Sequence, residues 1–153
     1  MSPTETAYAA YCNKRFPLPT EQQVATLEER LGAALPTDYR QFILQYNGGF
    51  FSEPEIASPD EDCPPDCLTD LWGIGAPARH AELGDDTDLF DDNFPTKLLP
   101  IGYTLSGNLL LTVTRKDEDH GCIFLKLKYS SDYFFLGATM DEFFKLLRAG
   151  EAK

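Results

Sequence analysis

The segment from Leu31 to Gly49, LGAALPTDYRQFILQYNGG, constrains the fold more than any other part of the chain, because it contains two helix ends and a helix start. Gly32 can adopt the positive φ that ends a helix, and Pro36 prevents that helix from continuing. Asn47-Gly48-Gly49 supplies a left-handed exit for the next helix. The spacing therefore predicts two helices, over residues 20–32 and 37–47, joined by a short connection.

Both predicted helices carry start signals and an apolar face. Thr20 with Gln23 forms a capping box for the first, and Thr37 is the expected N-cap of the second. The short connection predicts a compact helical hairpin or corner that packs against one face of a sheet. The apolar residues of the second helix recur at the i, i+3, i+4, i+7 spacing of one buried face: Tyr39, Phe42, Ile43 and Tyr46.

The same stretch, written as LG…LP-x-D-Y-x-x-F-x-x-x-Y-N-G-G, resembles the N-terminal signature of the SMI1/KNR4 family, the SUKH superfamily. The resemblance continues in LLPIGYTLSGNLLLTV (98–113), which is similar to the family's central hairpin. It ends with FFLGATMDEFFKLL (134–147), which is similar to the family's closing strand and helix, whereas residues 54–94 match poorly. The resemblance implies an α+β fold with a strongly bent antiparallel sheet and helices from both ends of the chain.

The residues themselves also predict the α+β class. From Leu98 onward the apolar period changes to two, which predicts consecutive antiparallel strands at 98–102, 109–114, 122–129 and 133–136. Thr139 with Glu142 is a second capping box. It begins a helix whose apolar face is Met140, Phe143, Phe144 and Leu147 and which ends at Gly150.

The remaining segments have weaker patterns. Residues 1–19 end in Pro17-Leu18-Pro19, so we expect any early helix to stop there and the segment to lie over the core. Phe50-Phe51 begins a strand or an extended turn. Leu68 to Ile74 predicts a short apolar strand, and residues 79–93 show a weak helical pattern.

Length and composition indicate one domain over residues 1–153, with an acidic irregular insertion around 53–96. The chain has 153 residues and 42% hydrophobic residues, which is ample for one core and short for two. No apolar run approaches the roughly 20 residues of a membrane helix, and the first residues lack the features of a secretory signal. We therefore expect a cytoplasmic protein without a membrane partner.

The net charge of −12 is concentrated in one segment. Between Glu53 and Asp92 there are thirteen acidic residues and one base, Arg79, whereas the rest of the chain has twelve of each. This balance argues against nucleic-acid binding, which needs Lys and Arg at the phosphates, and favours a basic protein partner. The alternative is a solvated face that keeps the protein soluble. The expected partner-binding residues combine acids with apolar anchors: Trp72, Asp85, Asp86, Asp88, Leu89, Phe90, Asp91 and Asp92.

No pattern indicates catalysis, a cofactor or a metal. Cys63 and Cys67 do not match a common zinc spacing, so we expect loop thiols that either stay reduced or pair with each other on oxidation. His80 and His120 lie in no recognisable catalytic motif. The acidic run 85–92 fails as a calcium loop because its fifth position, counted from Asp86, is Phe90.

The functional expectation comes from the family resemblance. It implies, for bacterial members, a non-enzymatic immunity protein that binds and neutralises a cognate polymorphic or contact-dependent toxin. The acidic segment adds the expectation of a basic toxin domain, such as a nuclease. The alternative is an intracellular adaptor or regulatory module that binds a host protein, as in the fungal cell-wall signalling members.

Overall fold

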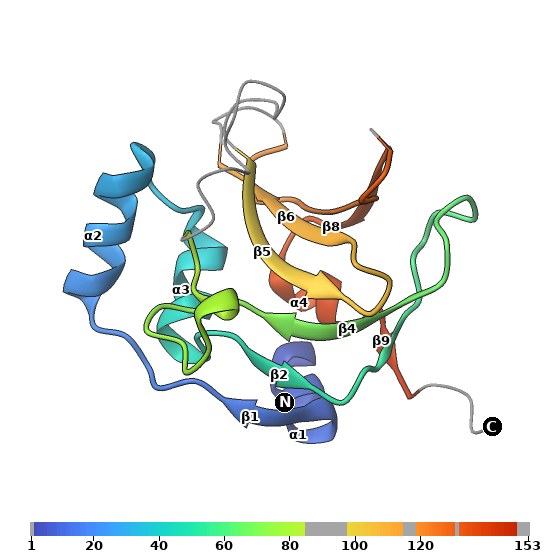
Figure 1. Ribbon diagram of the computed structural model, residues 1–153, viewed down its shortest axis with the longest axis horizontal. Helices are drawn as coiled ribbons and strands as arrows, with labels where there is room; N and C mark the ends of the chain where they lie inside the picture. The colour runs from blue at the N-terminus through green and yellow to red at the C-terminus, as the bar shows by residue number, and fades with distance from the viewer. Residues whose placement is uncertain (1, 85–97, 115–118, 131, 150–153) are drawn as a thin grey trace.

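The computed structural model describes residues 2–84, 98–114, 119–130 and 132–149, and Figure 1 shows a strongly bent antiparallel sheet with helices packed against it. The strand order is β1-β2-β4-β5-β6-β7-β8, and β3 pairs with both β4 and β9. This arrangement confirms the predicted α+β class.

The helices are α1 (Pro3–Tyr11), α2 (Glu21–Leu31), α3 (Thr37–Gln45) and α4 (Met140–Phe144). The strands are β1 (Cys12–Arg15), β2 (Gly49–Phe51), β3 (Glu55–Ile56), β4 (Asp66–Leu71), β5 (Leu98–Thr104), β6 (Leu109–Val113), β7 (Ile123–Lys126), β8 (Tyr133–Gly137) and β9 (Leu147–Arg148).

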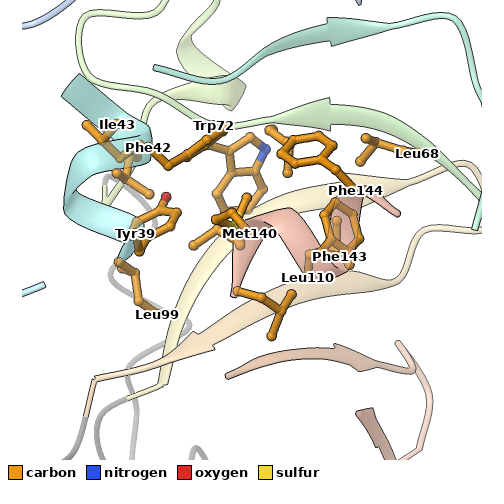
Figure 2. Close-up of a cluster of buried hydrophobic side chains, with 14 of the residues drawn as sticks. Tyr39, Phe42, Ile43, Leu68, Trp72, Leu99, Leu110, Met140, Phe143 and Phe144 are labelled. Atoms are coloured by element: carbon orange, nitrogen blue, oxygen red, sulfur yellow. The ribbon is translucent and has the colours of Figure 1, made fainter. Parts of the chain in front are cut away.

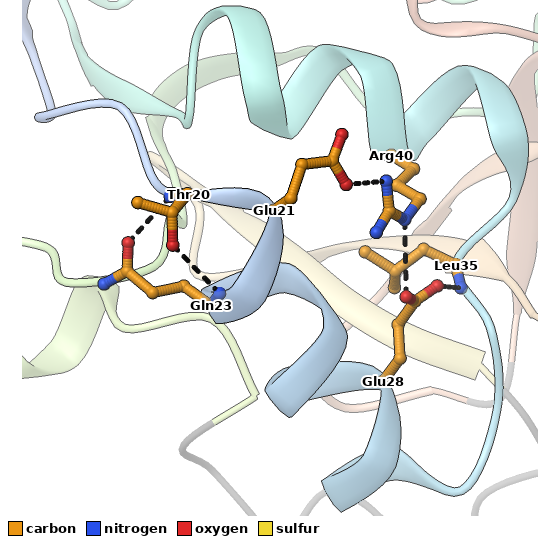
Figure 3. A network of polar contacts seen from close by, with 6 residues as sticks. All are labelled: Thr20, Glu21, Gln23, Glu28, Leu35 and Arg40. Carbon is orange, nitrogen blue, oxygen red and sulfur yellow. Dashed lines mark hydrogen bonds and ion pairs between the residues drawn. The ribbon is translucent and has the colours of Figure 1, made fainter.

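The capping box at the start of α2 is present as predicted (Figure 3). The Thr20 hydroxyl accepts a hydrogen bond from the Gln23 backbone N–H at 3.1 Å, and the Gln23 side chain accepts one from the Thr20 backbone N–H at 2.8 Å. Gly32 ends the helix in the left-handed region, at φ 70°. These contacts satisfy backbone groups that a helix end otherwise leaves to solvent, which confirms the predicted bounds of the first helix.

Arg40 of α3 joins the two helices of the hairpin (Figure 3). Its guanidinium lies 2.8 Å from a Glu21 carboxylate oxygen and 3.3 Å from one of Glu28. The other Glu28 oxygen accepts a hydrogen bond from the Leu35 backbone N–H at 2.7 Å. Because Glu28 also fixes the connecting segment, this network sets how α2 lies against α3.

The start of α3 corrects one prediction. The N-cap residue is Pro36, at φ −54° and ψ 141°, and no side chain caps the helix. Thr37 is the first helical residue and is exposed, so its predicted capping role is wrong. The reason is that Pro36 already holds the extended backbone that a capping residue requires, and Thr37 follows it inside the first turn.

The core forms where α3 and α4 meet the sheet (Figure 2). Tyr39, Phe42 and Ile43 of α3 are buried, as the helical spacing predicts. They face residues from α4 and from the strands around Trp72. The Phe42 ring lies within about 6 Å of several other rings, which fits the preferred range for aromatic pairs. Those rings, with their centroid distances, are Tyr39 (5.9 Å), Tyr46 (5.8 Å), Phe144 (5.8 Å) and Tyr8 (6.2 Å).

The exit of α3 passes extremely close to the end of β4. A Cβ placed on Gly48, which has φ 82°, would lie 2.4 Å from the Leu71 carbonyl oxygen, and one on Gly73 would lie 2.0 Å from the Asn47 carbonyl oxygen. The Asn47 side chain accepts a hydrogen bond from the Ile74 backbone N–H and donates to the carbonyls of Ile74 and Pro17, all at 2.7–2.8 Å. The two glycines therefore permit a backbone crossing that larger residues would block.

The N-terminal segment has more structure than predicted. Ser2 caps α1 by accepting a hydrogen bond from the Glu5 backbone N–H at 3.1 Å, and Pro3 occupies the first helical turn. β1 then pairs with β2 at the edge of the sheet. Burial raises the pKa of Tyr8 well above its ordinary value, so the phenol stays protonated and donates to the Gly48 carbonyl at 3.0 Å. The segment is thus part of both the helical layer and the sheet.

Two predicted helices differ from the structure in the residues that it describes. α4 ends at Phe144, and Leu147 lies in β9, which pairs with β3, so the predicted helical position of Leu147 is wrong. Pairing with β3 satisfies the backbone at Leu147, which the sequence pattern could not indicate. Within the predicted helix 79–93, Arg79–Ala81 forms a single 3-10 turn, and residues 85–93 lie outside the described residues, as does Gly150.

Truncation of a core ring tests this packing. Phe42→Ala removes a buried side chain from the centre of the aromatic cluster, so we expect the free energy of unfolding to fall by about 3–5 kcal/mol. Urea unfolding followed by circular dichroism measures the change. A loss below about 1 kcal/mol would show that this face of α3 is not part of the core.

Tyr39→Phe changes another buried aromatic residue of α3, about one helical turn before Phe42. The Tyr39 hydroxyl is buried and has no hydrogen-bond partner among the described residues. Because an unpaired buried hydroxyl costs free energy, its removal should leave stability unchanged or raise it by about 1 kcal/mol. A clear loss of stability in the same urea assay would mean that the hydroxyl makes a favourable contact.

Candidate protein-interaction surface

The acidic segment from Glu53 to Asp92 is divided by the fold into residues with different roles. Eight of its thirteen acids lie in the described part of the chain. Asp66 and Asp70 are buried, Glu55 and Glu82 are half-buried, and the other four are exposed: Glu53, Asp60, Glu61 and Asp62. The predicted binding residues Asp85, Asp86, Asp88, Leu89, Phe90, Asp91 and Asp92 lie outside the described residues.

Asp66 belongs to the internal polar network rather than to the surface. Its carboxylate accepts hydrogen bonds from the Ser106 backbone N–H at 3.1 Å and from the Asn108 side-chain amide at 2.9 Å. The Asn108 side-chain oxygen in turn accepts from the Lys128 backbone N–H at 2.9 Å. Asp66 therefore ties β4 to the β5–β6 turn and to the segment after β7, because a buried carboxylate requires such partners.

Trp72 is also internal, which corrects its predicted role. Its side chain is 7% exposed and lies in the core of Figure 2 between α3 and α4. The indole N–H donates to the Asp70 carboxylate at 3.0 Å, which satisfies the one polar group of the ring. A side chain that is 7% exposed presents almost no area to a partner, so Trp72 is not a surface anchor.

The two half-buried acids are held by contacts within the protein. Glu55 pairs with Arg148 at 2.6 Å, which supports the contact between β3 and β9. Glu82 accepts hydrogen bonds from the backbone N–H groups of Gly75 and Ala76, both at 2.9 Å. Both carboxylates are thus bound by donor groups of this same chain.

The exposed acids Asp60, Glu61 and Asp62 lie at the tip of the β3–β4 hairpin. Asp60 organises the turn, since its carboxylate accepts a hydrogen bond from the Asp62 backbone N–H at 2.9 Å and its carbonyl accepts from the Cys63 N–H at 3.1 Å. The side chains of Glu61 and Asp62 extend into solvent. The turn therefore presents three adjacent carboxylates on a short loop.

This tip faces an exposed aromatic ring on β8 across an open groove. The groove has a volume of about 540 Å³ and is lined by Pro59, Asp60, Glu61, Asp62 and Phe135. Phe135 is 44% exposed, which is unusual for a phenylalanine in a strand. Acidic side chains beside an exposed aromatic ring combine charge with apolar contact area, the two properties of a protein-interaction surface.

Sequence reasoning missed this surface. β8 was predicted as a strand, but the sequence YFFL carries apolar residues on both faces, so nothing distinguished the exposed ring from the buried ones. The relevant signal was that a strand apolar on both faces is either fully enclosed or has one face left for a partner. Which of these holds depends on the neighbouring strands.

A second hollow, of about 210 Å³, lies where α1, α3 and α4 meet. Its carboxylates connect the helices: Asp38 accepts a hydrogen bond from the Met140 backbone N–H at 2.8 Å, and Asp141 accepts from the backbone and hydroxyl of Thr4. These contacts cap two helix starts. The hollow is thus a junction between helices, with its acids used for capping.

The cysteines form no metal site in the part of the chain that the structure describes, where no group of three or more His, Cys, Asp or Glu side chains could hold an ion. Partial burial raises the pKa of the Cys63 thiol and of the Cys12 thiol, which favours the protonated form at neutral pH. The thiols are therefore poor candidates for nucleophiles.

No described helix has both the length and the apolar content needed to cross a membrane. The exposed large apolar side chains are dispersed over separate elements and include Leu18, Leu105, Tyr129 and Phe135. Among these, Phe135 lines the groove beside the hairpin tip.

Comparison with known proteins agrees with the fold. The profile of the SMI1 / KNR4 family (SUKH-1) matches residues 18–146. A protein of Bacillus subtilis (strain 168), described as SPbeta prophage-derived uncharacterized protein YokK, is 26% identical over an alignment 148 residues long, and the match covers 84% of this chain and 75% of that protein. No solved structure gives a significant match. The profile match runs from the segment before α2 to just after α4 and includes strands β2 to β8, and the chain therefore belongs to the SMI1/KNR4 family (SUKH-1).

Proposed function

We propose that this protein is an immunity protein that binds a cognate toxin and neutralises it without chemistry of its own. The observation that carries the proposal is membership of the SMI1/KNR4 family, whose members are often immunity proteins. The charge distribution supports a basic partner, since one segment contains the entire acidic excess of the chain.

Neutralisation in this proposal is steric and electrostatic. The acidic surface covers the substrate-binding face of a toxin, and a nuclease domain is the preferred example because its substrate is polyanionic. The binding residues are the acids and apolar side chains of the segment 85–92, namely Asp85, Asp86, Asp88, Leu89, Phe90, Asp91 and Asp92. Apolar anchors govern dissociation, whereas the charges raise the association rate.

The first experiment is co-expression with the product of the neighbouring gene. Rescue of growth, together with co-purification of the two proteins, is the result that the proposal requires. A neighbouring gene whose product is harmless to the cell, combined with capture of a host regulatory protein, would instead favour the adaptor function.

Charge reversal tests the role of the acidic segment. Replacing Asp85, Asp86, Asp88, Asp91 and Asp92 by Lys should lower the association rate by about tenfold or more and abolish protection. The free energy of unfolding should stay nearly constant, because surface charge pairs contribute about 0–1 kcal/mol each. Stopped-flow mixing of each variant with the cognate toxin, over a range of salt concentrations, measures the association rate.

The control variant reverses exposed acids on the helices. Glu5→Lys with Glu29→Lys changes charge on α1 and α2, and it is compared with Asp91→Lys plus Asp92→Lys. The helix variant should associate at nearly the wild-type rate. Equal rates and equal salt dependence for both variants and the wild type would show that residues 85–92 are a solvated face.

A further inference from the structure

β8 is an edge strand whose outer side is open in the described structure. Among the described strands it pairs with β7 alone, so the backbone groups on its other side have no strand partner. An edge of this kind is a template for adding another strand. The opposite edge, β1, differs because it carries Lys14 and Arg15, whereas both edge pairings, β1 with β2 and β7 with β8, contain one irregular step in register. Charges of this kind protect an edge from pairing, and β8, with Tyr133-Phe134-Phe135, has neither charge nor proline.

The side chains of β8 hold the strand in place and leave one ring exposed. Phe134 packs against the main core, and Tyr133 packs against the smaller cluster of Leu98, Leu111 and Val113. Phe135 makes an edge-to-face contact with Phe124 of β7 at 5.7 Å, and it also lines the open groove. The strand is therefore anchored by its neighbours, and the exposed ring of Phe135 is available to a ligand.

The groove beside this edge is acidic. Asp60, Glu61 and Asp62 line it, and the exposed Asp132 directly precedes β8. Lys126 of the adjoining strand β7 lies opposite Tyr133, and its ammonium donates hydrogen bonds to the carbonyls of Leu127 and Ser130 at 3.2 and 3.1 Å. The groove is open to solvent, so these carboxylates are accessible to a partner.

We propose that β8 binds an extended basic segment of a partner protein by strand addition. The backbone of that segment pairs with the open edge of β8, its Lys or Arg side chains meet Asp60, Glu61 and Asp62, and an apolar side chain packs on Phe135. The site consists of residues other than those of the segment 85–92. The identification of the partner as a toxin rests on the proposed function, whereas the chemistry of the bound segment does not.

A second copy of this chain is the disfavoured occupant. Pairing two β8 edges would bring two copies of Asp132 and two acidic hairpin tips close together, in a protein of net charge −12. Like charges at such an interface oppose association. A basic segment removes this repulsion and gains contact with the same carboxylates.

The test uses a defined probe and the full-length protein. A short blocked peptide of alternating lysine and valine is titrated to about 1 mM into isotopically labelled protein, a range that detects weak binding by NMR. We expect saturable amide shifts at Tyr133–Phe135 and Asp60–Asp62, and slower amide hydrogen exchange along β8. The same peptide with alternate N-methyl groups, and a glutamate–valine peptide, should each bind at least about tenfold more weakly.

Two variants and a control locate the site. Glu61→Lys with Asp62→Lys leaves the turn-forming Asp60 intact and should weaken binding by about tenfold. Phe135→Thr keeps a strand-forming residue while removing the ring, and should also weaken binding by about tenfold. Glu5→Lys with Glu29→Lys makes the same charge change elsewhere and should leave the affinity within about twofold.

Several results would overturn the proposal. They are the absence of saturable shifts at β8 in the wild type, equal binding of the N-methylated or the glutamate peptide, and unchanged affinity in both site variants. Sedimentation showing a dimer that Phe135→Thr dissociates would assign the edge to a second copy instead. Because no toxin is present in the assay, failure here leaves the proposed immunity function standing, and failure of co-expression leaves the strand-addition site standing.

Discussion

The backbone crossing between the end of α3 and the end of β4 is the contact on which the rest of the structure depends. Gly48 and Gly73 each lie against a carbonyl oxygen of the other segment. The Asn47 side chain is hydrogen-bonded to the backbone of Ile74 and of Pro17. This crossing holds α3 over the sheet at a fixed position. The buried face of α3 then meets α4 and Trp72, and the aromatic core of Figure 2 follows from that meeting.

The same packing decides which charges are available to a partner. Trp72 is drawn into the core, and its indole N–H requires an acceptor, which Asp70 supplies. Asp66 is likewise enclosed by the β5–β6 turn, and Glu55 and Glu82 bond groups of this chain. Carboxylates at the hairpin tip have no such internal donors apart from the turn backbone, so their charge is directed to solvent and towards the β8 groove. Whether the acids of one sequence segment form an acidic surface therefore depends on which of them the fold buries or pairs and which it leaves exposed.

The β8 edge shows how sheet topology creates a binding opportunity. In a closed barrel β8 would have a partner on both sides, but the bent sheet ends there, next to a hairpin that belongs to β3 and β4. The short strands β3 and β9 extend the sheet from β4 instead, and β8 has β7 as its one neighbour among the described strands. Main-chain pairing gives affinity and the adjacent acids give a preference for basic segments, so both properties come from one arrangement.

The sequence by itself determined the local elements with strong periodicity or caps: the α2–α3 hairpin, the four strands of the second half and the start of α4. These depend on residues close together in the chain, such as Thr20 with Gln23, and the family resemblance added their arrangement. Only the tertiary structure decided that Trp72 is internal, that Leu147 pairs with β3, and that Phe135 borders an acidic groove. The physical reason is that burial and strand pairing depend on partners distant in sequence, whereas hydropathy and turn signals report only what each segment can become.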